Sequence, residues 1–144
     1  ALLSDSGCDI HKLREKLDNN WSPARMALWV RLMQRVEISC DGRAALALAR
    51  LEDLRQCGAL KEDLEGLVEQ FRRLRGVEAS GILREDAPGV YKLSLRSTGT
   101  TDVRSVAVQF GGGGHRNAAG GTLRMEGEEA FDAVRTALCR MLRG

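Results

Sequence analysis

Residues 110–121 read Phe-Gly-Gly-Gly-Gly-His-Arg-Asn-Ala-Ala-Gly-Gly, and no other stretch of the chain is as rich in glycine. Glycine loses more backbone freedom on folding than any other residue. A run of four, residues 111–114, therefore suits a place where the backbone bends sharply or a ligand comes close to it. His115, Arg116 and Asn117 follow directly. Backbone amides beside a cation and a histidine can bind an anion, so the stretch predicts a phosphate-binding loop.

A second stretch, residues 90–97, alternates apolar and polar side chains. This pattern predicts a strand with one face in the core and the other face carrying Ser94 and Arg96, with Ser97 just beyond. Arginine offers a planar fork that binds phosphate through two hydrogen bonds. His115 can donate a hydrogen bond in either protonation state. The strand is therefore predicted to form a second wall of the phosphate site.

The glycine stretch does not match the common nucleotide-binding motifs. It lacks the Gly-Lys-Ser/Thr ending of a Walker A loop and the strand–helix context of a dinucleotide fold. Its spacing alone therefore leaves open a glycine-rich loop that binds nothing.

The order of predicted elements indicates the fold class. Strands interleaved with helices favour an α/β domain, with a mixed sheet of about five strands, helices packed on it and a helical linker in front. The predicted strands are residues 36–40, 44–49, 76–85, 90–97 and 122–125. The predicted helices are residues 9–17, 22–34, 51–56, 61–73, 103–109 and 128–142.

Ser22 and Pro23 predict the start of the helix over residues 22–34, as its N-cap and its first residue. Its apolar stripe is predicted to comprise Met26, Trp29, Val30 and Met33. Its arginines are predicted to form a solvated face, namely Arg25, Arg31 and Arg35.

Composition narrows the classes of function. The chain has 144 residues, enough for one compact domain, and its 22 basic against 20 acidic residues give a net charge of +2. This balance excludes a globally cationic, histone-like binder but leaves room for a local basic patch. No apolar run is long enough to span a membrane, so no membrane partner is expected. The first residues look like the cut end of a helix, and we expect the chain to be a fragment.

Cysteine and histidine usage argues against a metal site. Cys8, Cys40, Cys57 and Cys139 are scattered, without a Cys-x-x-Cys pair. A domain of this size does not require disulfides, so we expect reduced thiols and a cytoplasmic location. No catalytic triad or carboxylate cluster is visible either. The chain alone is predicted to have no catalytic residues and no metal ligands, and to act as a binding module.

Residues 111–120, with Ser94-Leu95-Arg96-Ser97 and Asp102-Val103, closely resemble the DHH-associated C-terminal domain of the DHH phosphoesterases. The resemblance is greatest to the nano-RNase and phosphoadenosine-phosphate phosphatase type, also called exopolyphosphatase-like. It implies that residues 1–34 are the helical linker after a catalytic domain. Residues 35–144 would then be the DHH-associated, substrate-binding domain.

Family members hydrolyse short oligonucleotides, phosphoadenosine phosphate or cyclic dinucleotides with two manganese ions in an N-terminal domain. The Asp-His-His motif of that domain is absent from this sequence. The resemblance therefore implies a substrate-binding half, inactive alone, that works with a DHH domain in cis on a short oligonucleotide or nucleotide phosphate. The implied substrate-binding residues are Arg96, His115, Gly111, Gly112, Gly113, Gly114, Ser94, Ser97 and Asn117.

Other interpretations stay open. The arginines at 72, 73 and 75 suit either a helix C-terminus or a non-catalytic RNA- or tRNA-binding module. A cyclic-dinucleotide phosphodiesterase domain would use the same phosphate site. The domain could also serve as a dimerisation surface, giving a homodimer.

Overall fold

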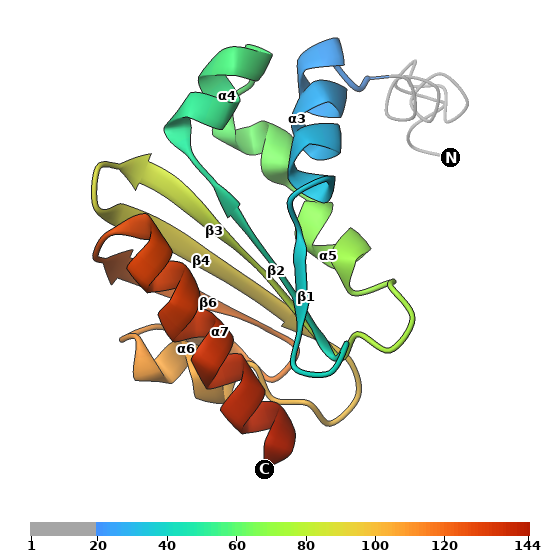
Figure 1. Cartoon of the computed structure of the whole chain (residues 1–144), viewed down its shortest axis with the longest axis vertical. Coiled ribbons are helices and arrows are strands. Elements are labelled where there is room, and N and C mark those ends of the chain that lie inside the picture. The colour runs from blue at the N-terminus through green and yellow to red at the C-terminus, as the bar shows by residue number, and fades with distance from the viewer. Residues whose placement is uncertain (1–19) are drawn as a thin grey trace, which may run out of the picture.

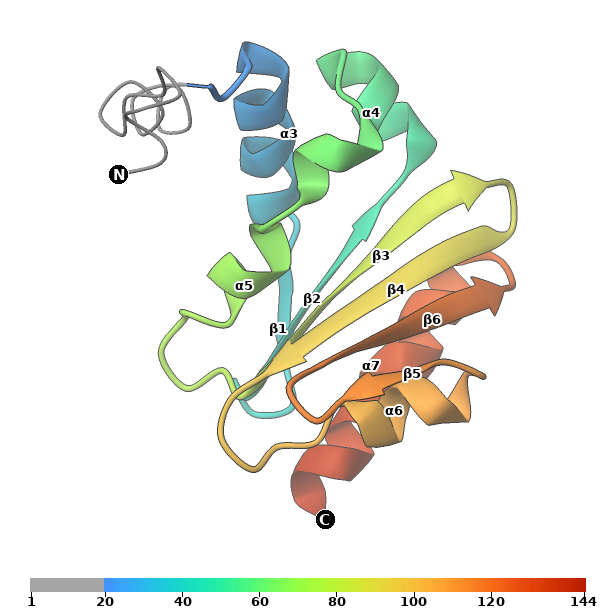
Figure 2. The ribbon, with the colours of Figure 1, turned by 180° about the vertical axis from the view of Figure 1, so that it is seen from behind.

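The computed structural model describes residues 20–144. They form one six-stranded sheet in the order β1-β2-β3-β4-β6-β5, with helices on both faces (Figures 1 and 2). The predicted α/β class is confirmed, with six strands in place of about five. The predicted helix over residues 9–17 lies outside the described residues. Within them, no helix has the length and apolar character needed to cross a membrane.

The strands are β1 (Glu37–Ser39), β2 (Ala44–Ala49), β3 (Ala79–Ala87), β4 (Val90–Ser97), β5 (Gly113–His115) and β6 (Ala118–Arg124). The helices are α3 (Pro23–Met33), α4 (Leu51–Cys57), the 3-10 turn η1 (Lys61–Leu64), α5 (Leu67–Phe71), α6 (Arg104–Gln109) and α7 (Gly127–Arg143). Both predicted hairpins are present, as the antiparallel pairs β1–β2 and β3–β4. Strands β2 and β3 are parallel, and α4, η1 and α5 form the crossover between them.

One face of the sheet is covered by α6 and α7. The apolar positions of β4 that the alternation predicted, Tyr91, Leu93 and Leu95, are almost fully buried there. They pack in one cluster with Val134 and Leu138 of α7. Burial of this kind contributes about 1.5–3 kcal/mol for each large apolar side chain, so this face holds much of the stability.

The opposite face is covered only in part. Helices α3, α4 and α5 pack over β1, β2 and β3, in a second cluster that includes Leu28, Phe71 and Ile82. No helix lies in front of β6 and β5 in Figure 2, where α6 and α7 are behind the sheet. The open face of the sheet is therefore formed by β6, β5 and the part of β4 that α5 does not cover.

Helix α3 begins as predicted but buries a different stripe. The side chain of Ser22 accepts a hydrogen bond from the amide of Arg25, and Pro23 opens the helix. Leu28 and Leu32 are fully buried, because this side of α3 faces α4, η1 and β2. The predicted stripe was wrong apart from Trp29, which is buried. Its other members stay exposed, namely Met26, Val30 and Met33.

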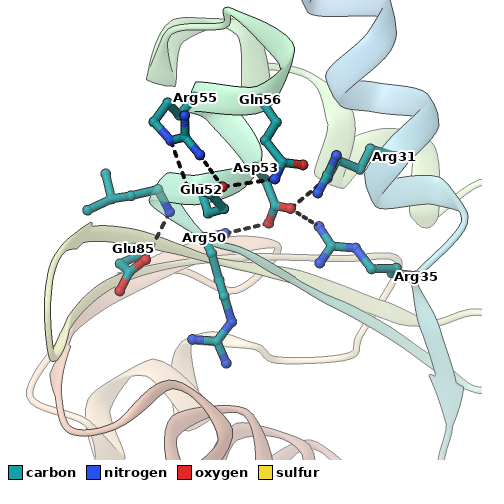
Figure 3. A network of polar contacts seen from close by, with 9 residues as sticks. Arg31, Arg35, Arg50, Glu52, Asp53, Arg55, Gln56 and Glu85 are labelled. Carbon is teal, nitrogen blue, oxygen red and sulfur yellow. Dashed lines mark hydrogen bonds and ion pairs between the residues drawn. The ribbon is translucent and has the colours of Figure 1, made fainter.

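The predicted solvated face of arginines is only partly confirmed, because Arg31 and Arg35 are partly exposed but also form ion pairs. Arg31 Nε lies 2.7 Å and Arg35 Nη2 lies 2.6 Å from Oδ1 of Asp53. Asp53 itself is only 2% exposed. Asp53 Oδ2 accepts a hydrogen bond from the amide of Arg50 at the start of α4. Figure 3 shows Arg31 of α3 and Arg35, which follows the helix, pointing at this carboxylate. The arginines thus fasten the C-terminal end of α3 to α4, because a buried carboxylate needs charged partners.

The helix predicted over residues 61–73 is broken. Gly66 has a φ of 92°, in the left-handed region, and serves as the N-cap of α5. An α-helix cannot continue through that conformation, so the segment splits into η1 and α5.

The prediction of reduced thiols fails at one pair of cysteines. Cys40 and Cys139 form a disulfide, with their Cα atoms 5.1 Å apart. Cys40 lies in the β1–β2 turn, and α7 passes beside that turn. The two residues are separated by 99 positions in the sequence, so their spacing along the chain gave no sign of the pairing.

Candidate functional site

The open face of the sheet brings Arg96 and His115 into one row. Arg96 of β4 pairs with Ala118 of β6, and Ala118 pairs with His115 of β5. Directly paired residues of neighbouring strands point to the same face, so both side chains project from the open face. Two strand spacings, about 10 Å, separate their backbones. Ala118 between them is small enough to leave space for a ligand.

The next row on this face is almost free of side chains. Ser94 of β4 pairs with Gly120, and Gly120 pairs with Gly113. A Cβ added to Gly120 would lie 2.2 Å from the carbonyl oxygen of Leu93, so this position needs glycine for packing. A Cβ added to Gly113 would meet nothing within 4 Å. Close packing within the described residues therefore does not account for glycine at 113.

The glycine stretch forms strands, which corrects the prediction of an open loop. Gly111 has a φ of 77° and turns the chain out of α6, after which β5 and β6 pair as a hairpin. A Cβ at Gly112 would lie 2.1 Å from the Gly120 carbonyl oxygen, and one at Gly114 would lie 2.6 Å from that of Ala118. The amide of Gly112 donates to the carbonyl of Ala107. These glycines allow the two strands to approach closely.

Ser97 and Asn117 lie next to the row of Arg96, in a network of their own. Ser97 is 1% exposed, and its hydroxyl donates to the carbonyl oxygen of Thr101 at 2.6 Å. The side-chain amide of Asn117 donates to the Ser97 hydroxyl oxygen at 2.9 Å. In the structure these two residues therefore connect the end of β4 to the β5–β6 turn.

Arg96 is held in place by two contacts. Its Nε donates to Oε1 of Glu69 on α5 at 2.9 Å, and its Nη1 donates to the carbonyl of Leu95. Its Nη2 has no hydrogen-bond partner among residues 20–144. The side chain is 30% exposed, so a ligand on the open face can reach this free edge of the guanidinium.

A groove of about 340 Å³ runs along the same face, between the crossover and strands β3 and β4. This volume is within the range of small-ligand sites. Its charged lining residues are Lys61, Glu65, Glu69, Arg84, Lys92 and Arg96. Sequence reasoning placed Lys92 on the polar side of its strand but gave it no role. It missed Lys61 and Glu69, because nothing in the local sequence shows that the crossover folds back over β4.

The open face brings together groups that can bind an anion. Among the described residues, no group of three or more histidine, cysteine, aspartate or glutamate side chains lies close enough to hold a metal ion. What the open face provides is a cation with a free edge, an exposed imidazole, a hydroxyl at Ser94 and an unobstructed backbone at Gly113.

Comparison with known proteins agrees with this description. The family described as DHHA1 domain matches residues 46–144. Over 79 residues the chain is 37% identical to a bifunctional oligoribonuclease and PAP phosphatase, NrnA, from Thermus thermophilus. That match covers 54% of this chain and 24% of the relative.

Two solved structures share the fold. An exopolyphosphatase-related protein from Bacteroides fragilis has a TM-score of 0.85 at 31% identity, covering 99% of this chain and 43% of that one. A pGpG-specific phosphodiesterase from Vibrio cholerae has a TM-score of 0.55 at 9% identity, covering 85% of this chain and 40% of that one. The second likeness concerns the fold alone. The chain spans less than half the length of each of these three proteins.

Proposed function

Because this chain belongs to the DHHA1 domain family, we propose that it is the substrate-binding domain of a DHH phosphodiesterase or phosphatase. The proposed substrates are nano-RNA and phosphoadenosine phosphate. The observation that carries the proposal is the shared row of Arg96 and His115 on the open face of the sheet. A substrate phosphate between them would receive hydrogen bonds from both side chains across the small Ala118.

The proposed roles follow from the contacts of each residue. Arg96 binds the phosphate through its free Nη2, because Nε and Nη1 are held by Glu69 and the backbone. His115 donates from the far side of the row. Gly113 and Gly114 let the phosphate approach the edge strand β5. Positive groups fixed in this way also stabilise charge that develops on the phosphate during hydrolysis.

The catalytic part of the enzyme is proposed to precede this domain. Residues 1–34 would connect it to an N-terminal DHH domain, with α3 fastened to the substrate-binding domain by Asp53. Two manganese ions held by that DHH domain would supply an activated water. The residues described here contain no ligand cluster for them.

Two further properties of the whole protein belong to the proposal. A homodimer is one, and a sizing column run on the full-length protein tests it. A cytoplasmic location is the other, and cell fractionation tests it. The Cys40–Cys139 disulfide argues against the cytoplasm, because thiols there are normally kept reduced.

The rival proposal is an RNA- or tRNA-binding module that uses the arginines at 72, 73 and 75. One of these arginines already has a structural partner. Arg72 Nη1 donates to the carbonyl oxygen of Ser97 at 3.0 Å. The rival predicts a preference for long RNA and a steep dependence on salt. A cyclic-dinucleotide phosphodiesterase would use the same site and would differ in its preferred ligand.

Calorimetry on the full-length protein tests the proposal. The ligands are a short 5′-phosphorylated oligoribonucleotide and phosphoadenosine phosphate, with a chelator present to prevent turnover. Arg96→Ala and His115→Ala should each weaken binding by about 1.5–3 kcal/mol, the contribution of a hydrogen bond to a charged group. Arg104→Gln, on α6 at the opposite face, is the control. Unchanged affinity in both site variants would contradict the proposed function.

A further inference from the structure

The end of the groove away from His115 carries a second group of cations. Arg84 of β3 and Lys92 of β4 are direct partners in the sheet, so both side chains project from the open face. Lys61, the first residue of η1, lines the same groove from the crossover. The three cations therefore come from three different elements and meet at one place.

The contacts of Asp86 show how close these cations are. Arg84 Nε lies 2.7 Å from Asp86 Oδ1, and this hydrogen bond lowers the pKa of Asp86. Burial opposes the shift, and the positive charges of Arg84, Lys61 and Lys92 lower the pKa further. Asp86 is thus shared by three cations, and even with Glu65, the other carboxylate that lines the groove near Lys61, positive charge remains in excess at this end.

The two lysines are the cations available to a ligand. Arg84 is committed to Asp86, and its side chain is only 19% exposed. Neither Lys61 nor Lys92 forms an ion pair with any residue from 20 to 144. A lysine ammonium in such a position attracts phosphate as a point charge.

The spacing along β4 sets the length of ligand that can use both ends. Lys92 and Arg96 lie four residues apart on the same face, or about 13 Å at the rise of a strand. A stacked nucleic-acid strand advances about 3.4 Å per nucleotide, so this distance corresponds to about four stacked nucleotides, and to fewer in an extended strand. The two phosphates of phosphoadenosine phosphate are carried by a single ribose. They are therefore too close together to reach both Lys92 and Arg96.

We infer that Lys61 and Lys92 form a second anion-binding subsite, which takes a downstream phosphate of the oligonucleotide whose first phosphate is held at Arg96. This inference rests on the proposed function and adds a preference to it. The groove favours oligonucleotides of about three or four units over phosphoadenosine phosphate, because only the longer ligand reaches both ends.

The test compares two ligands on the full-length protein, again with a chelator present. A 5′-phosphorylated tetraribonucleotide and phosphoadenosine phosphate are titrated into the wild type, Lys61→Gln/Lys92→Gln, Arg96→Ala and the control Arg104→Gln. The double lysine variant should bind the tetranucleotide about 5–10-fold more weakly and phosphoadenosine phosphate within about twofold of wild type. The salt slope for the tetranucleotide should fall by about one for each phosphate that a lysine no longer neutralises.

The outcomes separate the inference from the proposal beneath it. If Arg96→Ala weakens both ligands and the lysine variant changes neither, the second subsite is refuted and the proposed function stands. Equal weakening of both ligands by the lysine variant also refutes it, because no preference for length would follow. If Arg96→Ala changes neither ligand, the proposed function itself fails. Circular dichroism and a thermal melt confirm that each variant is folded.

Discussion

Oε1 of Glu69 lies 2.9 Å from Nε of Arg96, the cation proposed to hold the substrate phosphate. Glu69 is on α5 and Arg96 is on β4, so this ion pair joins the crossover to the open face. The other carboxylate oxygen of Glu69, Oε2, is buried and has no hydrogen-bond partner among residues 20–144. Glu69 therefore orients the arginine and also places a negative charge beside the phosphate site.

Neutralising Glu69 is expected to strengthen ligand binding. Glu69→Gln keeps an oxygen for Arg96 Nε but removes the charge that repels a phosphate. Affinity for a short 5′-phosphorylated oligonucleotide should rise about 2–5-fold at low salt, in line with the roughly 0.2–1 kcal/mol typical of partly exposed charge pairs. The gain should shrink as salt screens the charge. Weaker binding would instead show that the full negative charge is needed to position Arg96.

Two glycines of one row should respond in opposite ways to alanine. Gly120→Ala places a Cβ 2.2 Å from the carbonyl oxygen of Leu93 and should lower the free energy of unfolding by at least about 2 kcal/mol. Gly113→Ala meets nothing within 4 Å and should leave stability unchanged or slightly higher. Its methyl group would project onto the open face, in the row of Ser94 and Gly120, so binding should weaken about fivefold. Chemical denaturation and calorimetry measure the two effects, and full binding by Gly113→Ala would contradict the site.

The buried carboxylate of Asp53 should make stability depend on acid. Burial alone would raise its pKa, but hydrogen bonds from Arg35, the Arg50 amide and Arg31 outweigh this and lower it. A lowered pKa means that the stabilisation is fully present above about pH 4, the ordinary pKa of aspartate, and is lost as the pH falls through the folded-state value. Wild type should therefore lose more stability than Asp53→Asn on acidification below about pH 4.

At neutral pH, Asp53→Ala should cost about 2–3 kcal/mol in the free energy of unfolding. This is less than the roughly 3–5 kcal/mol for breaking a fully buried pair, because Arg31 and Arg35 remain partly exposed and can be hydrated. Asp132→Asn, which removes an exposed partner of Arg135, is the matched control and should cost less than about 1 kcal/mol. Equal losses in the two variants would contradict the role given to Asp53.

The disulfide should contribute strongly to stability, since it closes a long loop. Reduction, or Cys139→Ala, should lower the free energy of unfolding by about 3–5 kcal/mol, because the unfolded chain regains the freedom of the segment between the cysteines. The control is Cys57→Ala, because Cys57 is not in this disulfide. Its free energy of unfolding should still be higher under oxidising than under reducing conditions. Denaturation curves with and without reductant measure the effect. Identical curves for wild type would show that the bond does not form in solution.

The sequence predicted the parts of the fold that follow a simple period. Alternation over residues 90–97 predicted β4 with its buried face, and the pattern over residues 128–142 predicted the last helix, observed as α7. The glycine stretch was taken for a loop, because glycine has low strand propensity. The stretch nevertheless forms strands, because glycines let β5, β6 and β4 approach closely. This close approach depends on the neighbouring strands, which the local sequence does not show.

The candidate site could be predicted where its residues lie on a regular strand, but not where they come from the crossover. Ser94 and Arg96 were placed correctly on the polar side of their strand, and the structure puts His115 in the row of Arg96. Whether these residues bind substrate stays a prediction. Glu69 and Lys61 could not be predicted, because they reach the groove only when the crossover folds over β3 and β4. The Asp53 pairs were missed for the same reason, since their partners lie about twenty residues away in sequence.

The bond between Cys40 and Cys139 closes the chain into a covalent ring that contains Lys61, Lys92, Arg96 and His115. Helix α3 lies outside this ring. A protease that nicks one surface turn inside the ring would leave a single molecule until reductant is added, with the groove residues still tethered together. A cut between α3 and β1 would instead sever the peptide link to everything that precedes the ring. Helix α3 would then be held by its packing, by the ion pair of Arg31 with Asp53, and by hydrogen bonds from Arg25 and Trp29 to backbone carbonyls inside the ring.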